Sequence, residues 1–439
     1  MAYISIILIF SLVSIFNMVR LYTCHKWIKK GNQFAEHLDS NMLNENDVPL
    51  FILIPVLNEQ SIIADTYLHF RNLSKYYSNV FIVYITTEKE SVCTIKTYDI
   101  IENMICEMGD QEKIHLMNYP NKNGVMAHQL NYAVNKISEE RNSDEFWIGI
   151  YNADSRINKE TLDFMIDNIC SNKNGHTCYQ QYSWYYKLGK RRGGLLSSAA
   201  LWQSRWSLTF EMPRARFQLF LQKLNIPYFV KVILEKMNYV IGHGLFIKAT
   251  DIKMLGGFPE NTINEDAYLG YLLNCSNINI TPIPILEKAE SPSKLRVYIN
   301  QQATWFNGPC YAFLYYNLYR NKQEKKVCLR ELILACKLFC HTLYWILSPV
   351  LLLVICPLLT RNIMELMVWG IVVIVHLPLT HFFTRLLIVK NADTEKTTVP
   401  KSSLWCIIFY FVHCWGPIKN IFRQITRSNS INNKYKTER

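Results

Sequence analysis

The sequence predicts an α/β domain with a mostly parallel sheet, combined with transmembrane α-helices. Two patterns lead to this prediction. Between residues 49 and 162, short apolar runs alternate with helical patterns, and long apolar segments lie near both ends of the chain. The composition agrees, because half of the residues are apolar and 13% are aromatic. Trp and Tyr collect where a membrane meets water.

Four apolar runs have the length of buried strands. They are residues 50–54, residues 80–85, the stretch "KIHLMNYP" and residues 146–151. Helical patterns separate them, at residues 61–73, 92–108 and 125–137. Strands that alternate with helices form βαβ units and therefore a parallel sheet. The sequence contains neither GxGxxG nor GxxxxGK[ST], which excludes a dinucleotide fingerprint and a P-loop.

Charge and cysteine content limit the partners. The formal net charge is +12, and a basic chain can bind nucleic acid, anionic lipid or phosphorylated substrates. Because zinc-finger spacing and RNA-binding aromatic motifs are missing, we expect no nucleic-acid partner. The 13 Cys residues form no CxxC pair. We interpret them as packed thiols that face a reducing cytosol.

The N-terminal apolar segment predicts a membrane anchor. Residues 4–19 are almost wholly apolar, and Arg20, Lys26, Lys29 and Lys30 follow them. A signal peptide carries its positive charges before the apolar run, so the order here favours an anchor whose N-terminus lies outside. We therefore predict a transmembrane anchor over residues 1–21, then a polar linker over 22–48 that faces the cytoplasm.

Three apolar segments follow the soluble part. Leu332–Leu359 and Met364–Val389 are long enough to span, whereas Leu404–Pro417 is short and rich in aromatics. If all three spanned, the basic tail would lie outside, against the positive-inside rule. We therefore prefer an interfacial or re-entrant third segment. The predicted domains are an α/β domain at 49–300, an interfacial segment at 301–330, membrane helices at 331–420 and a basic cytoplasmic tail at 421–439.

The fourth apolar run ends on an acid. Asn152, Ala153 and Asp154 follow it directly. In open α/β sheets, ligands bind beyond the carboxyl ends of the strands, so an acid at this position can hold a metal or a ribose. The alternative is that Asp154 only caps the next helix.

Several motifs occur in a defined order. They are "PVLNE" from Pro55, "NAD" from Asn152, "GHGLFIK" from Gly242, "LGGFPENTINEDAYLG" from Leu255 and "QQATW" from Gln301. Over about residues 49–305, this order resembles glycosyltransferase family 2, in particular the membrane-bound branch with cellulose and hyaluronan synthases. The resemblance implies a GT-A fold, a nucleotide-sugar donor, Mg²⁺ or Mn²⁺, and inversion at the anomeric carbon. The ending K-T-E-R is similar to that of some bacterial members. Together with the apolar segments and the positive charges after residue 19, the resemblance implies a multi-pass protein of the bacterial cytoplasmic membrane, with a cytoplasmic catalytic domain.

The resemblance also assigns the donor site. Asp154 matches the metal-binding acid of the D-x-D motif, and Asn152 replaces the first Asp of that motif. A divalent ion there would stabilise the charge of the leaving diphosphate. Glu88 is a candidate for the acid near the donor's base, and Lys122 could replace the Lys that is usual where Met126 stands. The implied donor-binding residues are Pro55, Asn58, Glu59, Glu88, Lys122, Asn152, Asp154 and Gln301.

Glu265 and Asp266 match the T-E-D motif, with Asn264 in place of Thr. The resemblance implies that Asp266 is the general base that takes a proton from the acceptor hydroxyl. The alternative is an acid that complements the dipole at a helix start. Both roles are compatible with one residue.

The acceptor site is implied by two further matches. Gln301–Trp305 matches Q-x-x-R-W, with Trp305 beneath the acceptor sugar and Thr304 in place of Arg. The missing Arg removes a bidentate phosphate contact and weakens the case for a processive polymerase. Trp305 could instead be an interfacial Trp. Gly242, His243 and Gly244 would line the acceptor site, with a packed core histidine as the alternative for His243.

The insert at residues 179–236 is basic and aromatic. We favour an amphipathic helix on anionic lipid. The alternative is an acceptor groove in which Tyr182, Trp184 and Tyr185 stack on sugar rings.

The predicted function is that of a membrane-bound inverting glycosyltransferase in polysaccharide or glycolipid synthesis. One alternative is an enzyme that makes a single transfer to a polyprenyl- or lipid-linked acceptor. Another is an inactive membrane scaffold with this fold, which the substitutions at Asn152, Met126 and Thr304 favour. The expected partners are a nucleotide-sugar, a glycan or lipid-linked acceptor, and membrane lipid.

Overall fold

The computed structural model describes the chain except for residues 37–47, 91–94, 172–174, 188–193, 263, 325–328, 392–398 and 427–439. The chain divides into two compact units. We name residues 30–182 and 239–287 the α/β unit, and residues 1–29, 183–238 and 288–439 the helical unit. The insert at 183–238 thus groups with the membrane segments, whereas the sequence placed it in a domain at 49–300.

The α/β unit contains one seven-stranded sheet in the order β3-β2-β1-β4-β7-β5-β8. Its strands are β1 (Leu50–Pro55), β2 (Val80–Thr87), β3 (Ile114–Tyr119), β4 (Trp147–Ile150), β5 (Cys178–Gln180), β7 (Leu245–Lys248) and β8 (Ile280–Pro282). The strands β3, β2, β1 and β4 are all parallel, which confirms the mostly parallel sheet predicted from the sequence. The strands β1, β2 and β4 are largely apolar and buried, because both faces of a parallel sheet are covered, whereas the edge strand β3 is only partly buried.

Helices separate the parallel strands as the sequence predicts. The helices of the unit are α2 (Ile63–Ser74), α3 (Thr97–Met108), α4 (Met126–Arg141), α5 (Lys159–Ser171), α9 (Ala249–Met254) and α10 (Glu265–Cys275). Their apolar faces pack on the sheet. In α2, for example, Ile63, Tyr67 and Phe70 recur at helical spacing and are at most 1% exposed.

The sheet is mixed beyond β4. Strand β7 pairs antiparallel with both β4 and β5, and β5 pairs parallel with β8. The sequence analysis did not predict β7, because a four-residue apolar run carries too little periodic signal.

The helical unit consists almost wholly of helices. They are α1 (Ala2–Glu36), α6 (Gly194–Trp206), η2 (Ser207–Glu211), α7 (Met212–Lys223), α8 (Tyr228–Leu234), α11 (Leu295–Cys310), α12 (Ala312–Gln323), α13 (Leu329–Val350), η3 (Leu351–Ile355), α14 (Cys356–Leu358), α15 (Ile363–Ile374), η4 (Val375–Leu379), α16 (Thr380–Asn391), α17 (Trp405–Val412) and α18 (Trp415–Thr426). The segments η2, η3 and η4 are π-helical. A two-stranded sheet joins β6 (Ser183–Lys187) to β9 (Glu287–Glu290).

Three helical stretches among the described residues are long and apolar enough to cross a membrane. They are Ala2–Phe34, Leu329–Leu358 and Ile363–Asn391. The first helix therefore runs well beyond the anchor predicted at 1–21. The polar residues that follow include no proline, so they continue the backbone hydrogen bonds. The segment expected not to span is divided between α17 and α18, which have 8 and 12 residues, too few for a span of about 20.

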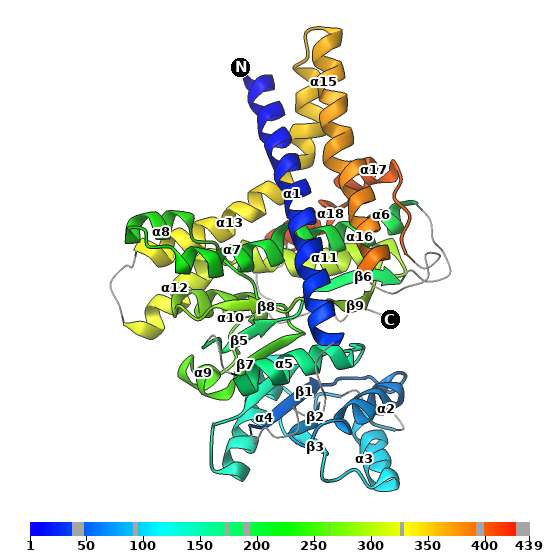
Figure 1. The fold of residues 1–439 in the computed structure, drawn as a ribbon, viewed down its shortest axis with the longest axis vertical. Coiled ribbons are helices and arrows are strands. Elements are labelled where there is room, and N and C mark those ends of the chain that lie inside the picture. The colour runs from blue at the N-terminus through cyan, green and yellow to red at the C-terminus, as the bar shows by residue number, and fades with distance from the viewer. Residues whose placement is uncertain are drawn as a thin grey trace. The chain divides into compact units, whose positions relative to one another are not determined.

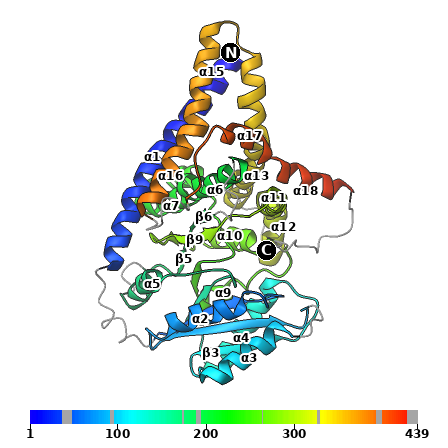
Figure 2. The same cartoon turned by 90° about the vertical axis from the view of Figure 1, so that its right-hand side faces the viewer.

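Helix α1 lies beside α15 and α16 and runs in the same direction as they do (Figures 1 and 2). Contacts join them at three levels: Tyr3 to the Glu365 carbonyl, Ser14 to His376, and His25 to Asn391. The chain therefore crosses the length of this bundle in alternating directions through α1, α13 and α15–α16. The ends of α1 and α16 consequently lie at the same end of the bundle.

Candidate functional site

The four parallel strands end at one edge of the sheet. Leu53 of β1 pairs with Ile150 at the end of β4, and Thr87 at the end of β2 pairs with Tyr119 at the end of β3. Pro55 ends β1 opposite Ile85. Residues that follow these strands therefore share the edge where α/β sheets bind ligands.

Strand β7 brings the GHG motif to this edge. Because β7 is antiparallel to β4, its first residue, Leu245, pairs with Ile150. The Gly244 N–H donates to the Ile150 carbonyl at 2.7 Å, and the Gln181 N–H donates to the Gly244 carbonyl at 2.7 Å. Gly244 has a φ of 69°, and a Cβ there would lie 2.8 Å from the Gln181 carbonyl oxygen. Only glycine fits this position without strain.

Asp266 lies next to Gly242. Helix α10 begins at Glu265, and Asp266 accepts a hydrogen bond from the Ala267 N–H at 2.8 Å. A Cβ at Gly242 would lie 3.5 Å from Asp266 Oδ2 and 3.6 Å from Met126 Cε. The fold thus brings together two residues that the sequence assigned to the acceptor and to the base. Glu265 is only 3% exposed, so it lies beneath the helix start.

Asp154 lies in an exposed turn just beyond β4, and Asn152 beside it is partly buried. The Ser155 N–H donates to the Asn152 carbonyl at 3.0 Å and closes this turn. Helix α5 begins only at Lys159, where Thr161 hydrogen-bonds Asn158. The alternative that Asp154 caps the next helix is therefore wrong, because Asn158 precedes that helix.

The predicted donor residues after β1 and β2 lie at the same edge. Asn58 adopts a left-handed conformation with φ of 54°, which Asn tolerates better than most residues. Glu59 is 8% exposed, and its N–H donates to Thr97 Oγ1 at 3.2 Å. Glu88 accepts a hydrogen bond from Asn118 Nδ2 at the end of β3. Lys122 is exposed.

Gln301 and Trp305 belong to α11 of the helical unit. Gln301 Oε1 accepts a hydrogen bond from Gln203 Nε2 at 2.8 Å. Thr304 Oγ1 donates to the Asn300 carbonyl at 3.2 Å, within its own helix. Trp305 is 40% exposed. The hydroxyl at position 304 is thus directed to the backbone, at the position where the Q-x-x-R-W motif has an Arg.

Sequence reasoning missed the partner of His243. His243 Nε2 lies 3.2 Å from Glu287 Oε2, and the Glu287 side chain is 3% exposed. The Glu287 N–H donates to the Tyr182 carbonyl at 2.9 Å, which places Glu287 at the same edge. No local pattern marks Glu287, because the contact joins residues far apart in the chain. His243 is therefore oriented by a buried carboxylate.

A closed polar network lies behind this edge. Tyr151 OH donates to Gln181 Oε1 at 2.6 Å, and Gln181 Nε2 donates to Thr161 Oγ1 at 2.9 Å. Burial raises the pKa of Tyr151 well above its usual value, and the Glu287 carboxylate adds to this. Tyr151 is therefore a neutral hydrogen-bond donor at physiological pH.

The insert shows buried rather than exposed rings where an acceptor groove was considered. Tyr182 is 1% and Trp184 is 2% exposed, so neither ring has a face on which a sugar could stack, and Tyr185 is only partly buried. Exposed apolar side chains lie instead on α8, where Tyr228, Phe229 and Ile233 are 63–70% exposed. This surface agrees with the favoured interpretation, in which the insert contacts lipid.

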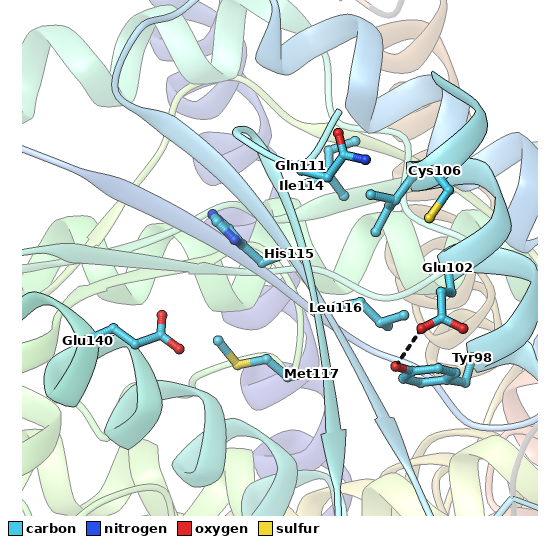
Figure 3. A pocket seen from close by; sticks show the side chains of 10 residues that line it. Tyr98, Glu102, Cys106, Gln111, Ile114, His115, Leu116, Met117 and Glu140 are labelled. Atoms are coloured by element: carbon cyan, nitrogen blue, oxygen red, sulfur yellow. Dashed lines mark hydrogen bonds between the residues drawn. The ribbon is translucent and has the colours of Figure 1, made fainter. Parts of the chain in front are cut away.

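A pocket elsewhere in the α/β unit lies over the edge strand β3 (Figure 3). His115 and Met117 are on one face of β3, toward Glu140 of α4, and Leu116 faces α3 on the other. The pocket includes the first residues of β3, whereas Asp154 and Asp266 lie at the carboxyl edge. It therefore contributes nothing to the candidate site.

No metal cluster is preformed in the part of the chain that the structure describes, where no three His, Cys, Asp or Glu side chains converge. A magnesium-type ion in a nucleotide site usually takes one or two protein oxygens and completes its shell with phosphate and water. The carboxylate of Asp154 and the amide oxygen of Asn152 fit that requirement.

No family model and no curated protein matches the sequence. Among solved structures, the mannosyltransferase PcManGT from Pyrobaculum calidifontis, in complex with GDP-Man and Mn2+, is 13% identical with a TM-score of 0.46, and the match covers 87% of this chain and 100% of that one. S. aureus TarS 1–349 is 12% identical with a TM-score of 0.40, covering 86% and 92%. Its complex with UDP is 13% identical with a TM-score of 0.37 over the same shares. Likenesses this distant carry no argument about function, which is built below on the residues.

Proposed function

We propose that this chain is a membrane-bound, inverting glycosyltransferase. It moves a sugar from a nucleotide-sugar to a hydroxyl group of a glycan or glycolipid acceptor. The observation that carries the proposal is the position of Gly242 beside the Asp266 carboxylate. Both residues belong to the α/β unit, as does Asp154, which follows β4. The proposed base Asp266, the glycine beside it and the proposed metal ligand Asp154 are therefore parts of one unit.

The donor diphosphate would lie near Asp154 and Asn152. These two residues would hold Mg²⁺ or Mn²⁺, which neutralises the charge that develops on the leaving diphosphate. Pro55, Asn58 and Glu59 after β1 would contact the nucleotide, together with Glu88 and Lys122. Glu88 already accepts a hydrogen bond from Asn118, so it is positioned to accept from a base or ribose.

The acceptor hydroxyl would lie between Gly242 and Asp266. Asp266 takes the hydroxyl proton while the oxygen attacks the anomeric carbon, and the bond from that carbon to the diphosphate oxygen breaks. Attack opposite the leaving group inverts the configuration. Gly242 leaves room beside Oδ2 for this hydroxyl, because it has no side chain. His243, fixed by Glu287, would hydrogen-bond the acceptor.

The membrane role is supported by three helical stretches of spanning length. Arg20, Lys26, Lys29 and Lys30 follow the apolar part of the first one, which favours a cytoplasmic α/β unit. Because α1 and α16 end at the same end of their bundle, the basic tail would lie on that side too.

A single transfer to a lipid-linked acceptor is the second candidate, and Thr304 favours it. Its hydroxyl is bonded to the Asn300 carbonyl, so it does not replace the phosphate contact of an Arg. Polymerisation depends on repeated donor loading, and a missing diphosphate ligand would weaken it. Product length distinguishes the two candidates, because a single transfer adds one sugar.

Release of a nucleoside diphosphate by the purified full-length protein tests the proposal. A panel of nucleotide-sugars is supplied with Mn²⁺ or Mg²⁺, and calorimetry measures donor binding. Asp154→Ala should remove metal-dependent donor binding. Glu139→Gln, on the exposed face of α4, is the control that should change neither binding nor release. If no donor binds, or if Asp154→Ala keeps its metal dependence, the chain is a scaffold or Asp154 has another role.

A further inference from the structure

A cluster of polar side chains lies inside the helical unit. We name Arg205 of α6, His376 of η4 and His381 of α16 the Arg205 cluster. Arg205 is 5% exposed and both histidines are fully buried. The Arg205 Cζ lies 4.8 Å from the centre of the Trp202 ring, and the same ring meets His381 edge-on at 5.9 Å. Arg205 and His381 therefore both contact the Trp202 ring, and His376 lies in the π-helical turn that leads directly into α16.

The cluster presents hydrogen-bonding atoms without partners among the described residues. These atoms are Nη1 of Arg205, Nε2 of His376 and both ring nitrogens of His381. The groups that act electrostatically on Arg205 are Tyr344, Tyr410 and Cys406, with no described carboxylate among them. A buried guanidinium without a counter-ion is costly, and such groups are normally paired.

A neighbouring histidine shows that this packing can satisfy an imidazole. His413 Nε2 accepts from Trp202 Nε1 at 3.0 Å, and its Nδ1 lies 2.9 Å from Tyr298 OH. The four atoms of the Arg205 cluster named above have no such partners among the described residues. π-Helical turns flank them, since η2 begins two residues after Arg205 and η4 contains His376. Such turns frequently mark functional sites.

The position along the helices indicates depth in a membrane. His376 and His381 lie in the candidate span Ile363–Asn391. At 1.5 Å per residue, they lie roughly 20 and 27 Å from the start of that helix. The hydrocarbon core is about 30 Å thick. Both histidines therefore lie well inside this candidate span, away from its start.

We propose that the Arg205 cluster binds the phosphate monoester of a membrane lipid. A guanidinium forms paired, charge-assisted hydrogen bonds to phosphate oxygens, and neutral imidazoles add N–H donors. The phosphate supplies the missing counter-ion, and the lipid chain lies among the apolar helices. A lipid is favoured over a soluble phosphate because of this depth. The binding requires no sugar transfer, so the inference stands apart from the proposed function.

Binding of lipid phosphates to the full-length protein in nanodiscs tests this. The probes are a polyprenyl monophosphate and phosphatidic acid, with neutral polyprenol as the uncharged lipid and pyrophosphate as the soluble anion. The two lipid phosphates should bind at least about 10-fold more tightly than polyprenol, because a charge-assisted hydrogen bond is worth roughly that much or more. Pyrophosphate should not compete. Competition by pyrophosphate at equal concentration would mean a soluble ligand and would overturn the lipid assignment.

Arg205→Gln should weaken lipid-phosphate binding about 10- to 100-fold, while polyprenol binding stays the same. His381→Asn is a second variant that leaves the charge in place, and it should weaken binding less. Arg330→Gln is the matched control, because Arg330 is partly buried, in the same unit, but bonds Glu235 at 2.6 and 2.9 Å. It should lower thermal stability and leave lipid binding unchanged. If Arg205→Gln and His381→Asn both bind lipid phosphate as the wild type does, the cluster is not the site.

Discussion

Two buried polar regions of the molecule, one in each unit, differ in how many of their hydrogen-bonding atoms have partners. In the α/β unit, Tyr151, Gln181 and Thr161 form a closed chain of hydrogen bonds. In the helical unit, Arg205 and His381 present atoms that no described residue bonds. The side chains of both regions are at most 5% exposed, so burial alone does not explain the contrast. A closed network stabilises the fold that contains it, whereas open groups are retained for something that the chain itself does not supply.

The same distinction applies within the α/β unit. The network behind the strand ends fixes the backbone, and the carboxylates of Asp154 and Asp266 lie in front of it, both accessible to solvent. Substitutions in the network should therefore change stability, and substitutions at the open groups should change binding or rate. The predictions below test this separation in order of decreasing effect.

The largest effect is expected for Asp266→Asn. The amide keeps the shape and suits a helix start, but it cannot accept a proton. Because general-base catalysis contributes roughly 10² to 10⁴ in rate, transfer should fall by that factor while donor affinity stays within a few-fold. Rate measurements on the active donor and a thermal unfolding scan check this. Loss of donor binding instead would place Asp266 in the donor site.

Gly244→Ala should destabilise the fold more than Gly242→Ala. At Gly244, a Cβ meets the Gln181 carbonyl at 2.8 Å at a φ of 69°. The left-handed conformation and the clash together should cost about 2–4 kcal/mol. At Gly242, the Cβ would make ordinary contacts of 3.5 and 3.6 Å. That variant should unfold like the wild type but transfer more slowly, since its methyl group lies beside Asp266. Equal unfolding midpoints for the two variants would contradict the assignment.

Tyr151→Phe should cost about 1–3 kcal/mol, because it leaves the buried Gln181 Oε1 without its donor. Thermal or denaturant unfolding of the full-length chain measures this loss. Tyr98→Phe, which removes a hydrogen bond to Glu102 in an exposed setting, is the control and should change stability by less than about 0.5 kcal/mol. A Tyr151→Phe variant as stable as its control would show that the network is not structural.

The smallest effect should appear on acidification. Burial lowers the pKa of His115, partly offset by the Glu140 carboxylate, which raises it. A histidine whose pKa is lower in the folded state contributes stability above its unfolded pKa of about 6.5, and that contribution is lost as the pH falls through the folded pKa. His115→Gln should therefore flatten the fall in stability below about pH 6.5. Unfolding midpoints of the wild type and of His115→Gln, measured from pH 7 to 5, check this. A midpoint that falls at least as steeply with pH in the variant as in the wild type would contradict the assignment.

Local patterns in the sequence predicted much of the α/β unit and the membrane segments. Residues 50–54 and 80–85 fall within β1 and β2, because a run of apolar residues between turns reads as a buried strand without any distant information. The spans at Leu332–Leu359 and Met364–Val389 were found by length and hydropathy alone. Asp154 was noticed because it directly follows an apolar run, whereas Asp266 was assigned only through its match to the T-E-D motif.

Only the tertiary structure decided which of these elements meet. The antiparallel insertion of β7 beside β4 brings Gly242 to Asp266 and His243 to Glu287. The packing of α6 against α16 places Arg205 with His381. A periodic pattern extends over about one element. Strand order and helix packing depend instead on contacts between residues far apart in the chain, and no local pattern records the loop-closure cost or the shape of these contacts. The sequence by itself therefore determined most of the elements and pointed to several candidate site residues, and the fold determined their neighbours.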